Sequence, residues 1–143
     1  MDNTDHKILD ILQHDGRISM KNLGKQVSLT SPAVAERVKK MEDSGIIMGY
    51  SAIVNPKKLN KLVRAIINVG LKVSYHKSFI KLASEEKAII ECHHLTGDDC
   101  MQIKVIVEDT AELEELLNRI QEIGSTKTTI ILSSPLENKP ILP

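Results

Sequence analysis

Basic side chains gather between positions 17 and 40 of the chain. The cations in this segment are Arg17, Lys21, Lys25, Arg37, Lys39 and Lys40. Glu36 is the one acid among them, although the whole chain has 19 Lys+Arg, 19 Asp+Glu and no formal net charge at pH 7. Clustered cations on a neutral protein are typical of a surface that binds nucleic-acid phosphates. A solvated helix surface is the alternative, because lysine is common on any protein surface.

Apolar residues recur at helical spacing twice across this segment, which predicts two short amphipathic helices. They are Met20, Leu23 and Val27, then Val34, Val38 and Met41. Thr30, Ser31 and Pro32 suit the start of the second helix, because Ser and Thr cap a helix and Pro fits its first turn. Gly45 suits its end. A short helix, a turn and a longer capped helix form the helix-turn-helix plan, in which the second helix enters the major groove of DNA.

The second of these helices has a face that points away from the domain. With Val34, Val38 and Met41 turned inward, the opposite face carries Pro32, Glu36, Lys39 and Asp43, with Lys40 beside them. Arg37 lies at the edge of the buried stripe, so it either reaches a phosphate or forms an ion pair inside the domain. The candidate DNA-binding residues are Lys21, Lys25, Thr30, Ser31, Pro32, Ala35, Glu36, Arg37, Lys39 and Lys40.

The rest of the first half frames this motif. Ile8, Ile11 and Leu12 predict a first helix that packs behind it, with Thr4 or Asp5 as its cap. Residues 46–54 predict an extended or hairpin segment, the wing of a winged helix-turn-helix, and the Asn-Pro pair at 55–56 then breaks the chain. We therefore expect a DNA-binding domain at 1–54, a linker at 55–61 and a second domain at 62–143.

The second half alternates strands and helices. Period-two patterns predict strands at 63–73, 89–95, 101–107 and 127–133, and helices follow the first and third of them. This order is the ferredoxin-like βαββαβ unit, so the chain as a whole is expected to be α+β. Its helices cover one face of the sheet. The other face includes Ile66, Leu95 and Ile106, and a partly apolar open face favours self-association.

Four segments together resemble the Lrp/AsnC, or feast/famine, transcription regulators. They are LTSPAVAERVKKMEDSGII, GYSAIVNPKKL, ECHHLTGDDCMQIKV and LSSPLENKPILP, and the resemblance covers nearly the whole chain. It implies a DNA-binding regulator that dimerises through the ferredoxin-like half, with dimers that assemble further into tetramers or octamers. It also implies an amino-acid effector at subunit interfaces, near the loop formed by Thr96, Gly97, Asp98, Asp99 and Cys100. Many members have a Tyr-Asp pair where this chain has Asp99 and Cys100.

The loop and the strand before it raise two further questions: the role of Gly97 and the presence of a metal site. Gly97 is either a plain turn residue or a turn whose N–H groups face a carboxylate. A metal site is also conceivable, because six side chains here are of types that bind metal ions: Cys92, His93, His94, Asp98, Asp99 and Cys100. In a hairpin, however, Cys92 would lie opposite Ile103, about 10 Å along the sheet from Cys100. This distance argues against a metal site and against a disulfide.

Composition and motifs exclude several function classes. Aromatic residues are 2% of the chain, too few to bind single-stranded nucleic acid by stacking. We find no catalytic motif and expect neither an enzyme nor a cofactor. No apolar run approaches the ~20 residues of a membrane span. The N-terminus does not resemble a signal peptide, and two cysteines fit a reducing cytosol, so we expect a cytoplasmic protein without membrane contact.

We therefore expect a sequence-specific transcription regulator that binds double-stranded DNA, self-associates and responds to a small ligand such as an amino acid. One alternative is an architectural protein that wraps DNA with little effector control. Another is a ligand-sensing or metal enzyme whose first domain does not read DNA.

Overall fold

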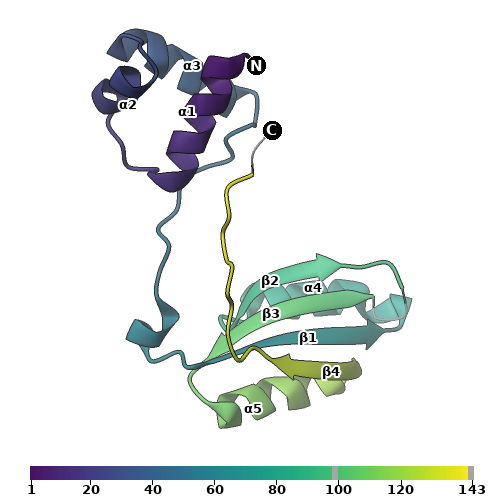
Figure 1. Cartoon of the computed structure of the whole chain (residues 1–143). Helices are drawn as coiled ribbons and strands as arrows, with labels where there is room; N and C mark the ends of the chain where they lie inside the picture. The colour runs from purple at the N-terminus through teal and green to yellow at the C-terminus, as the bar shows by residue number, and fades with distance from the viewer. Residues whose placement is uncertain (98–99, 142–143) are drawn as a thin grey trace. The chain divides into compact units, whose positions relative to one another are not determined.

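The chain forms two compact units (Figure 1). The computed structural model describes residues 1–97 and 100–141. One unit comprises Met1–Ile53 together with the segment from Leu136 onward, and the other comprises Val54–Pro135. The structure thus groups the C-terminal segment with the first unit, whereas the division expected from the sequence placed it with the second.

Three helices build the first unit: α1 (Asn3–His14), α2 (Met20–Gln26) and α3 (Ser31–Asp43). Asp2 caps α1, because its Oδ1 accepts the N–H groups of Thr4 and Asp5, and Asp5 in return accepts the N–H of Asp2 at 2.9 Å. The cap therefore lies before the residues expected from the sequence. The helices share an apolar core made of Ile8, Leu12, Leu23, Val34, Val38 and Met41. The predicted inward face of α3 is thereby confirmed.

A tight turn joins α2 to α3. Ser28 has a positive φ of 57°, and the N–H of Leu29 donates to the carbonyl oxygen of Gly24 at 2.9 Å. A Cβ atom on Gly24 would lie 2.6 Å from the carbonyl oxygen of Leu29. The turn therefore packs its backbone directly on α2, and this position requires glycine.

Two segments outside the helices complete the first unit. Residues 46–54 form no strand, so the predicted hairpin does not form there. Near the C-terminus, the side chain of Gln13 makes two hydrogen bonds with the backbone of Ile141. Its Nε2 donates to the carbonyl oxygen at 3.0 Å and its Oε1 accepts the N–H at 2.8 Å. These bonds attach the C-terminal segment to α1.

The second unit contains β1 (Val63–Leu71), α4 (His76–Glu85), β2 (Ile89–His94), β3 (Met101–Val107), α5 (Thr110–Gln121) and β4 (Gly124–Ile130). The four strands are antiparallel in the order β2-β3-β1-β4, and both helices cover one face (Figure 1). Buried residues from that face of the sheet and from the helices make one core. The predicted βαββαβ arrangement is confirmed.

Several boundaries differ from the sequence-based expectation: β1 ends at Leu71, β2 ends at His94, and β4 spans Gly124–Ile130. The helix expected from residue 74 begins at His76, after a 3-10 turn at Val73–Tyr75. The last strand, expected from residue 127, begins at Gly124. A Cβ there would lie 2.7 Å from the carbonyl oxygen of Gly70 and 2.6 Å from the side chain of Leu71, so only glycine allows β4 to pair with β1 at this point.

Candidate nucleic-acid interface and effector region

Two features hold the outward face of α3 in place. Val34, Val38 and Met41 anchor the helix in the core. Thr30 caps its start, since its Oγ1 accepts the N–H of Ala33 at 3.4 Å. The opposite face exposes Pro32, Glu36, Lys39, Lys40 and Asp43 to solvent. Ser31 is also exposed and Ala35 is half-buried, so the structure brings the predicted residues of α3 onto one exposed side, with Arg37 at its edge.

Each lysine on this face has an acidic partner four residues away. The Nζ of Lys40 lies 2.8 Å from Glu36 Oε1, and the Nζ of Lys39 lies 3.0 Å from Asp43 Oδ2. The hydrogen bond and charge of Lys40 hold the pKa of the Glu36 carboxyl below its usual range. Two cations and two anions therefore balance, and the outward face of α3 is less basic than the count along the sequence suggested.

Arg37 is used inside the domain. Its Nη1 donates to Asp5 at 2.6 Å and to Asp2 at 2.7 Å, and its side chain is only 33% exposed. Backbone N–H donors at the start of α1, with the Arg37 guanidinium next in weight, lower the pKa of both carboxyls. Hydrogen bonds from Arg37 to Asp5 and Asp2 raise the pKa of the guanidinium. Of the two roles expected for Arg37, the structure shows the ion pair inside the domain. This ion pair braces α3 against the start of α1.

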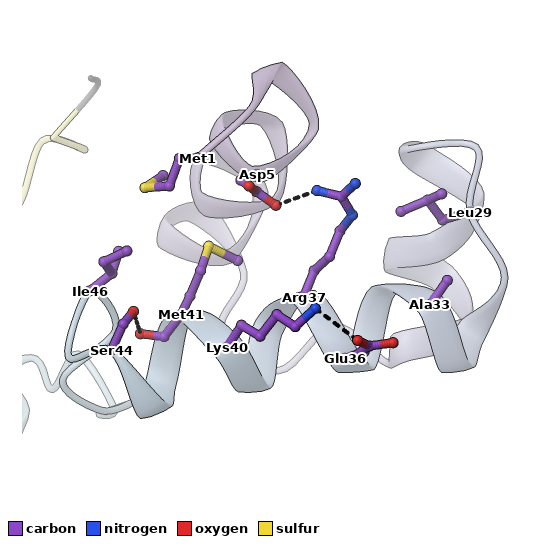
Figure 2. Close-up of a pocket in the computed structure, with 10 residues that line it drawn as sticks. All are labelled: Met1, Asp5, Leu29, Ala33, Glu36, Arg37, Lys40, Met41, Ser44 and Ile46. Carbon is purple, nitrogen blue, oxygen red and sulfur yellow. Dashed lines mark hydrogen bonds and ion pairs between the residues drawn. The ribbon is translucent and has the colours of Figure 1, made fainter.

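A shallow cleft of about 570 Å³ lies between the start of α1 and the flank of α3 (Figure 2). Leu29, Met41 and Ile46 give it an apolar surface. Its charged lining groups point toward one another, Arg37 toward Asp5 and Lys40 toward Glu36 (Figure 2). Both cations that line the cleft are thus already paired with carboxylates. Among the described residues, the cleft therefore has no unpaired cation that could bind a phosphate.

The unpaired cations of the motif lie on and before α2. Arg17, Lys21 and Lys25 are exposed, and none of them has an acidic partner in the part of the chain that the structure describes. Lys21 and Lys25 are four residues apart, so both project from the same side of α2. Ser19 caps this helix by accepting the N–H of Asn22 at 3.2 Å. These lysines can meet phosphates without first giving up another partner.

The loop between β2 and β3 is described in part. Its predicted residues Asp98 and Asp99 lie outside the described residues. Cys92 pairs with Ile103, as the sequence predicted, and the N–H of Leu95 donates to the carbonyl oxygen of Cys100 at 2.8 Å. Thr96 and Gly97 are exposed, and Gly97 has a φ of 114°, which favours glycine.

The Cys100 thiol lies against the end of β1 and the start of α4. Its Sγ accepts the N–H of Leu71 at 3.4 Å and lies 3.4 Å from His76 Nε2, whose ring stacks edge to face with that of His94. Both cysteines are free thiols, and partial burial raises the pKa of Cys92. Within residues 1–97 and 100–141, no group of three or more His, Cys, Asp and Glu side chains is arranged to hold a metal ion.

The face of the sheet opposite the helices is mixed in character, half-buried on the central strands β1 and β3 and largely exposed on the edge strands. Ile66 and Ile106 supply apolar surface. Beside them, Gln102 donates to Asn68 at 2.9 Å, and the Nζ of Lys104 donates to Glu91 at 3.2 Å on the same sheet. None of the helices that the described residues form combines the length and apolar character that a membrane crossing requires.

Two domain families match the chain: the AsnC-type helix-turn-helix domain over residues 1–42 and the Lrp/AsnC ligand binding domain over residues 64–141. The uncharacterised HTH-type transcriptional regulator YezC of Bacillus subtilis is 41% identical over 94% of this chain and 95% of its own length. The leucine-responsive regulatory protein of Haemophilus influenzae is 34% identical over 92% of this chain and 84% of its own. The solved structure of LrpC from Bacillus subtilis matches with a TM-score of 0.92 and 30% identity, over 97% of this chain and 99% of that chain.

Proposed function

The chain belongs to the Lrp/AsnC family of DNA-binding transcription regulators, and on that premise we propose that it binds specific duplex sites as a homo-oligomer tuned by an amino acid. Its first unit carries the AsnC-type helix-turn-helix domain and its second the ligand-binding domain. We assign DNA binding to 1–54, the linker to 55–61, and self-association and effector binding to 62–143. This protein acts by binding, and no catalytic step is part of the proposal.

One observation carries the DNA-binding proposal: a capped, exposed helix is fixed by a tight turn to a helix with unpaired lysines. In this arrangement α3 enters the major groove while α2 crosses the phosphate backbone. Lys21 and Lys25 bind phosphates directly. Lys39 exchanges its exposed pair with Asp43 for a DNA contact, because exposed pairs are weak and screened by salt. Lys40 contacts the DNA from the same face of α3. Arg37 supports binding by keeping α3 in position.

Self-association follows from the open face of the sheet. Ile66 and Ile106 place apolar surface on it, and the Asn68–Gln102 pair on the same two central strands has its side chains hydrogen-bonded to each other. Two copies related by a two-fold axis place two α3 helices on half-sites about 34 Å, one DNA turn, or a multiple apart. Sedimentation equilibrium tests this: a dimer or larger assembly at micromolar concentration is expected, and a stable monomer contradicts it.

The effector proposal concerns the loop of Thr96, Gly97, Asp98, Asp99 and Cys100. Backbone N–H groups of a glycine turn can hold a carboxylate, and an aspartate can hold an ammonium group. The relative from Haemophilus influenzae is named for its response to leucine, which supports an amino acid as the class of ligand. A site at a subunit contact would couple ligand binding to assembly, because a ligand shifts an equilibrium by its differential affinity for the two states.

A thermal-shift screen of the amino acids tests the effector. A ligand that binds only the folded protein raises its melting temperature by mass action. Gly97→Val should abolish the shift, since valine disfavours a φ of 114°, and should leave effector-free DNA binding near the wild-type level. If no amino acid shifts the wild type, the effector proposal is wrong, and the architectural alternative gains support.

Selection of binding sites from a pool of random duplexes tests the DNA-binding proposal as a whole. Recovery of a shared motif with two-fold symmetry is the expected result. Recovery of duplexes without any shared motif would contradict sequence-specific binding. Regularly phased protection over long DNA would then favour wrapping.

A further inference from the structure

Glu36 is an unusual residue for a surface that meets DNA. It projects from the middle of the outward face of α3 and its side chain is 68% exposed, so its carboxylate would approach the phosphates of a bound duplex. An anion in this place opposes the phosphate contacts that surround it unless it meets a hydrogen-bond donor in the groove. In the major groove the donors are the amino groups of cytosine (N4) and adenine (N6).

The Glu36–Lys40 pair presents an acceptor and a donor side by side. Glu36 Oε1 and Lys40 Nζ are 2.8 Å apart. In a C·G base pair the cytosine N4 donor and the guanine O6 acceptor are joined by a hydrogen bond, so they are separated by about 2.9 Å. The distance between Glu36 Oε1 and Lys40 Nζ is thus nearly the distance between cytosine N4 and guanine O6. One side chain can therefore face each base of the pair.

The two side chains favour C·G over A·T. Adenine places its N7 acceptor beside the N6 donor, where it repels a carboxylate, whereas cytosine has no acceptor beside N4. Guanine offers both O6 and N7 to a lysine, whereas thymine offers O4 alone with a methyl group beside it. The pKa of Glu36 lies below its usual range, so the acceptor remains ionised at neutral pH.

We propose that the Glu36–Lys40 ion pair reads one C·G base pair in each half-site, Glu36 accepting from cytosine N4 and Lys40 donating to guanine O6 or N7. This inference rests on the proposed entry of α3 into the major groove. Pro32 and Ala35 lie nearer the start of the same helix and present carbon atoms suited to a thymine methyl group. Asp43 lies nearer the end of α3, paired with Lys39, and we expect its charge to oppose phosphates without reading a base.

The test uses the full-length protein and the site recovered by selection. Each base pair of that site is replaced in turn, and affinities are measured for the wild type and for Glu36→Gln, Lys40→Ala and Asp43→Asn. In the wild type, replacing the C·G pair by T·A or A·T should weaken binding about fivefold or more. Glu36→Gln should shift the preference there toward adenine, because glutamine pairs with adenine N6 and N7. Lys40→Ala should remove the preference for guanine.

Asp43→Asn is the matched control, because it removes an exposed, lysine-paired acid from the same face. It should strengthen binding to all duplexes by a similar factor and leave the base preference unchanged. The inference is overturned if the selected site lacks a C·G pair that both Glu36 and Lys40 variants affect, or if Glu36→Gln behaves like the control. In either case specific binding persists and the proposed function stands. Absence of any preferred site overturns the inference and the sequence-specific function together.

Discussion

Replacing Gly24 by alanine tests whether the turn holds α3 as described. The new Cβ would lie 2.6 Å from the carbonyl oxygen of Leu29, a contact that real Cβ atoms essentially never show. The neighbour is backbone and not the flexible end of a side chain, so relief requires α2 and the turn to separate. That movement also strains the hydrogen bond from the N–H of Leu29 to the Gly24 carbonyl oxygen.

The magnitude follows from two opposing effects. In an unobstructed helix, alanine in place of glycine stabilises by about 1 kcal/mol. Overpacking against surroundings that cannot relax easily costs about 1–3 kcal/mol. Because the obstruction at Gly24 is backbone, the cost lies in the upper part of that range, and we expect a net loss of about 1–2 kcal/mol in the stability of the first unit.

Amide hydrogen exchange of the full-length protein measures this change in each unit separately. Protection in α2 and α3 should fall by a factor of about 5–30 in Gly24→Ala, while protection in β1 and β3 should remain unchanged. Ser28→Gly, in the same turn, should act in the opposite direction, because glycine relieves the positive φ of 57° at that residue. A Gly24→Ala protein with undiminished protection in α2 and α3 would refute the packing of the turn on α2.

Three further predictions concern the first unit. Tyr75→Phe leaves Tyr50 as the one tyrosine of the chain, so ultraviolet absorbance can follow its ionisation. Partial burial and the hydrogen bond to Glu42 raise the pKa of Tyr50 to about 12. A titration midpoint near pH 10 would contradict this. Arg37→Ala should destabilise the first unit in thermal unfolding at pH 7. The difference from wild type should shrink below about pH 3.8, since the partner carboxyls have lowered pKa values and their stabilising charge is lost on protonation. Gln13→Ala should speed exchange of the Ile141 amide, which donates to the Gln13 side chain, and an unchanged rate would show that the C-terminal segment is not held on α1.

Local patterns were enough to predict most of the fold. The spacing of Val34, Val38 and Met41 is a property of one helix, and the structure buries all three. The alternation in the second half likewise predicted the strands and, through the turn at Gly97, the pairing of Cys92 with Ile103. In each case the residues that decide the outcome are close in sequence, so their periodicity specifies the element.

Contacts between distant residues were not predictable in the same way. Arg37 meets Asp2 and Asp5 only because α1 packs against α3, and the sequence left its role open. Nothing in the sequence around Gly24 indicates that the backbone of Leu29 packs directly against it. The pairing of Lys40 with Glu36, in contrast, was visible as a four-residue spacing, and counting cations without this spacing made α3 look more basic than it is.

The salt dependence of duplex binding tests most directly whether this helix-turn-helix unit binds DNA through α2 and α3. Affinity should be measured from low to moderate salt for the wild type, for the double variant Lys21→Ala/Lys25→Ala, and for Lys77→Ala, an exposed lysine of α4, as control. We expect the slope of log affinity against log salt to fall by about 0.9 for each lost phosphate contact, so by about 1.8 in the double variant, and to stay unchanged in the control. An unchanged slope in the double variant, or an affinity that does not depend on salt in the wild type, would contradict the assignment of α2 to the phosphate backbone.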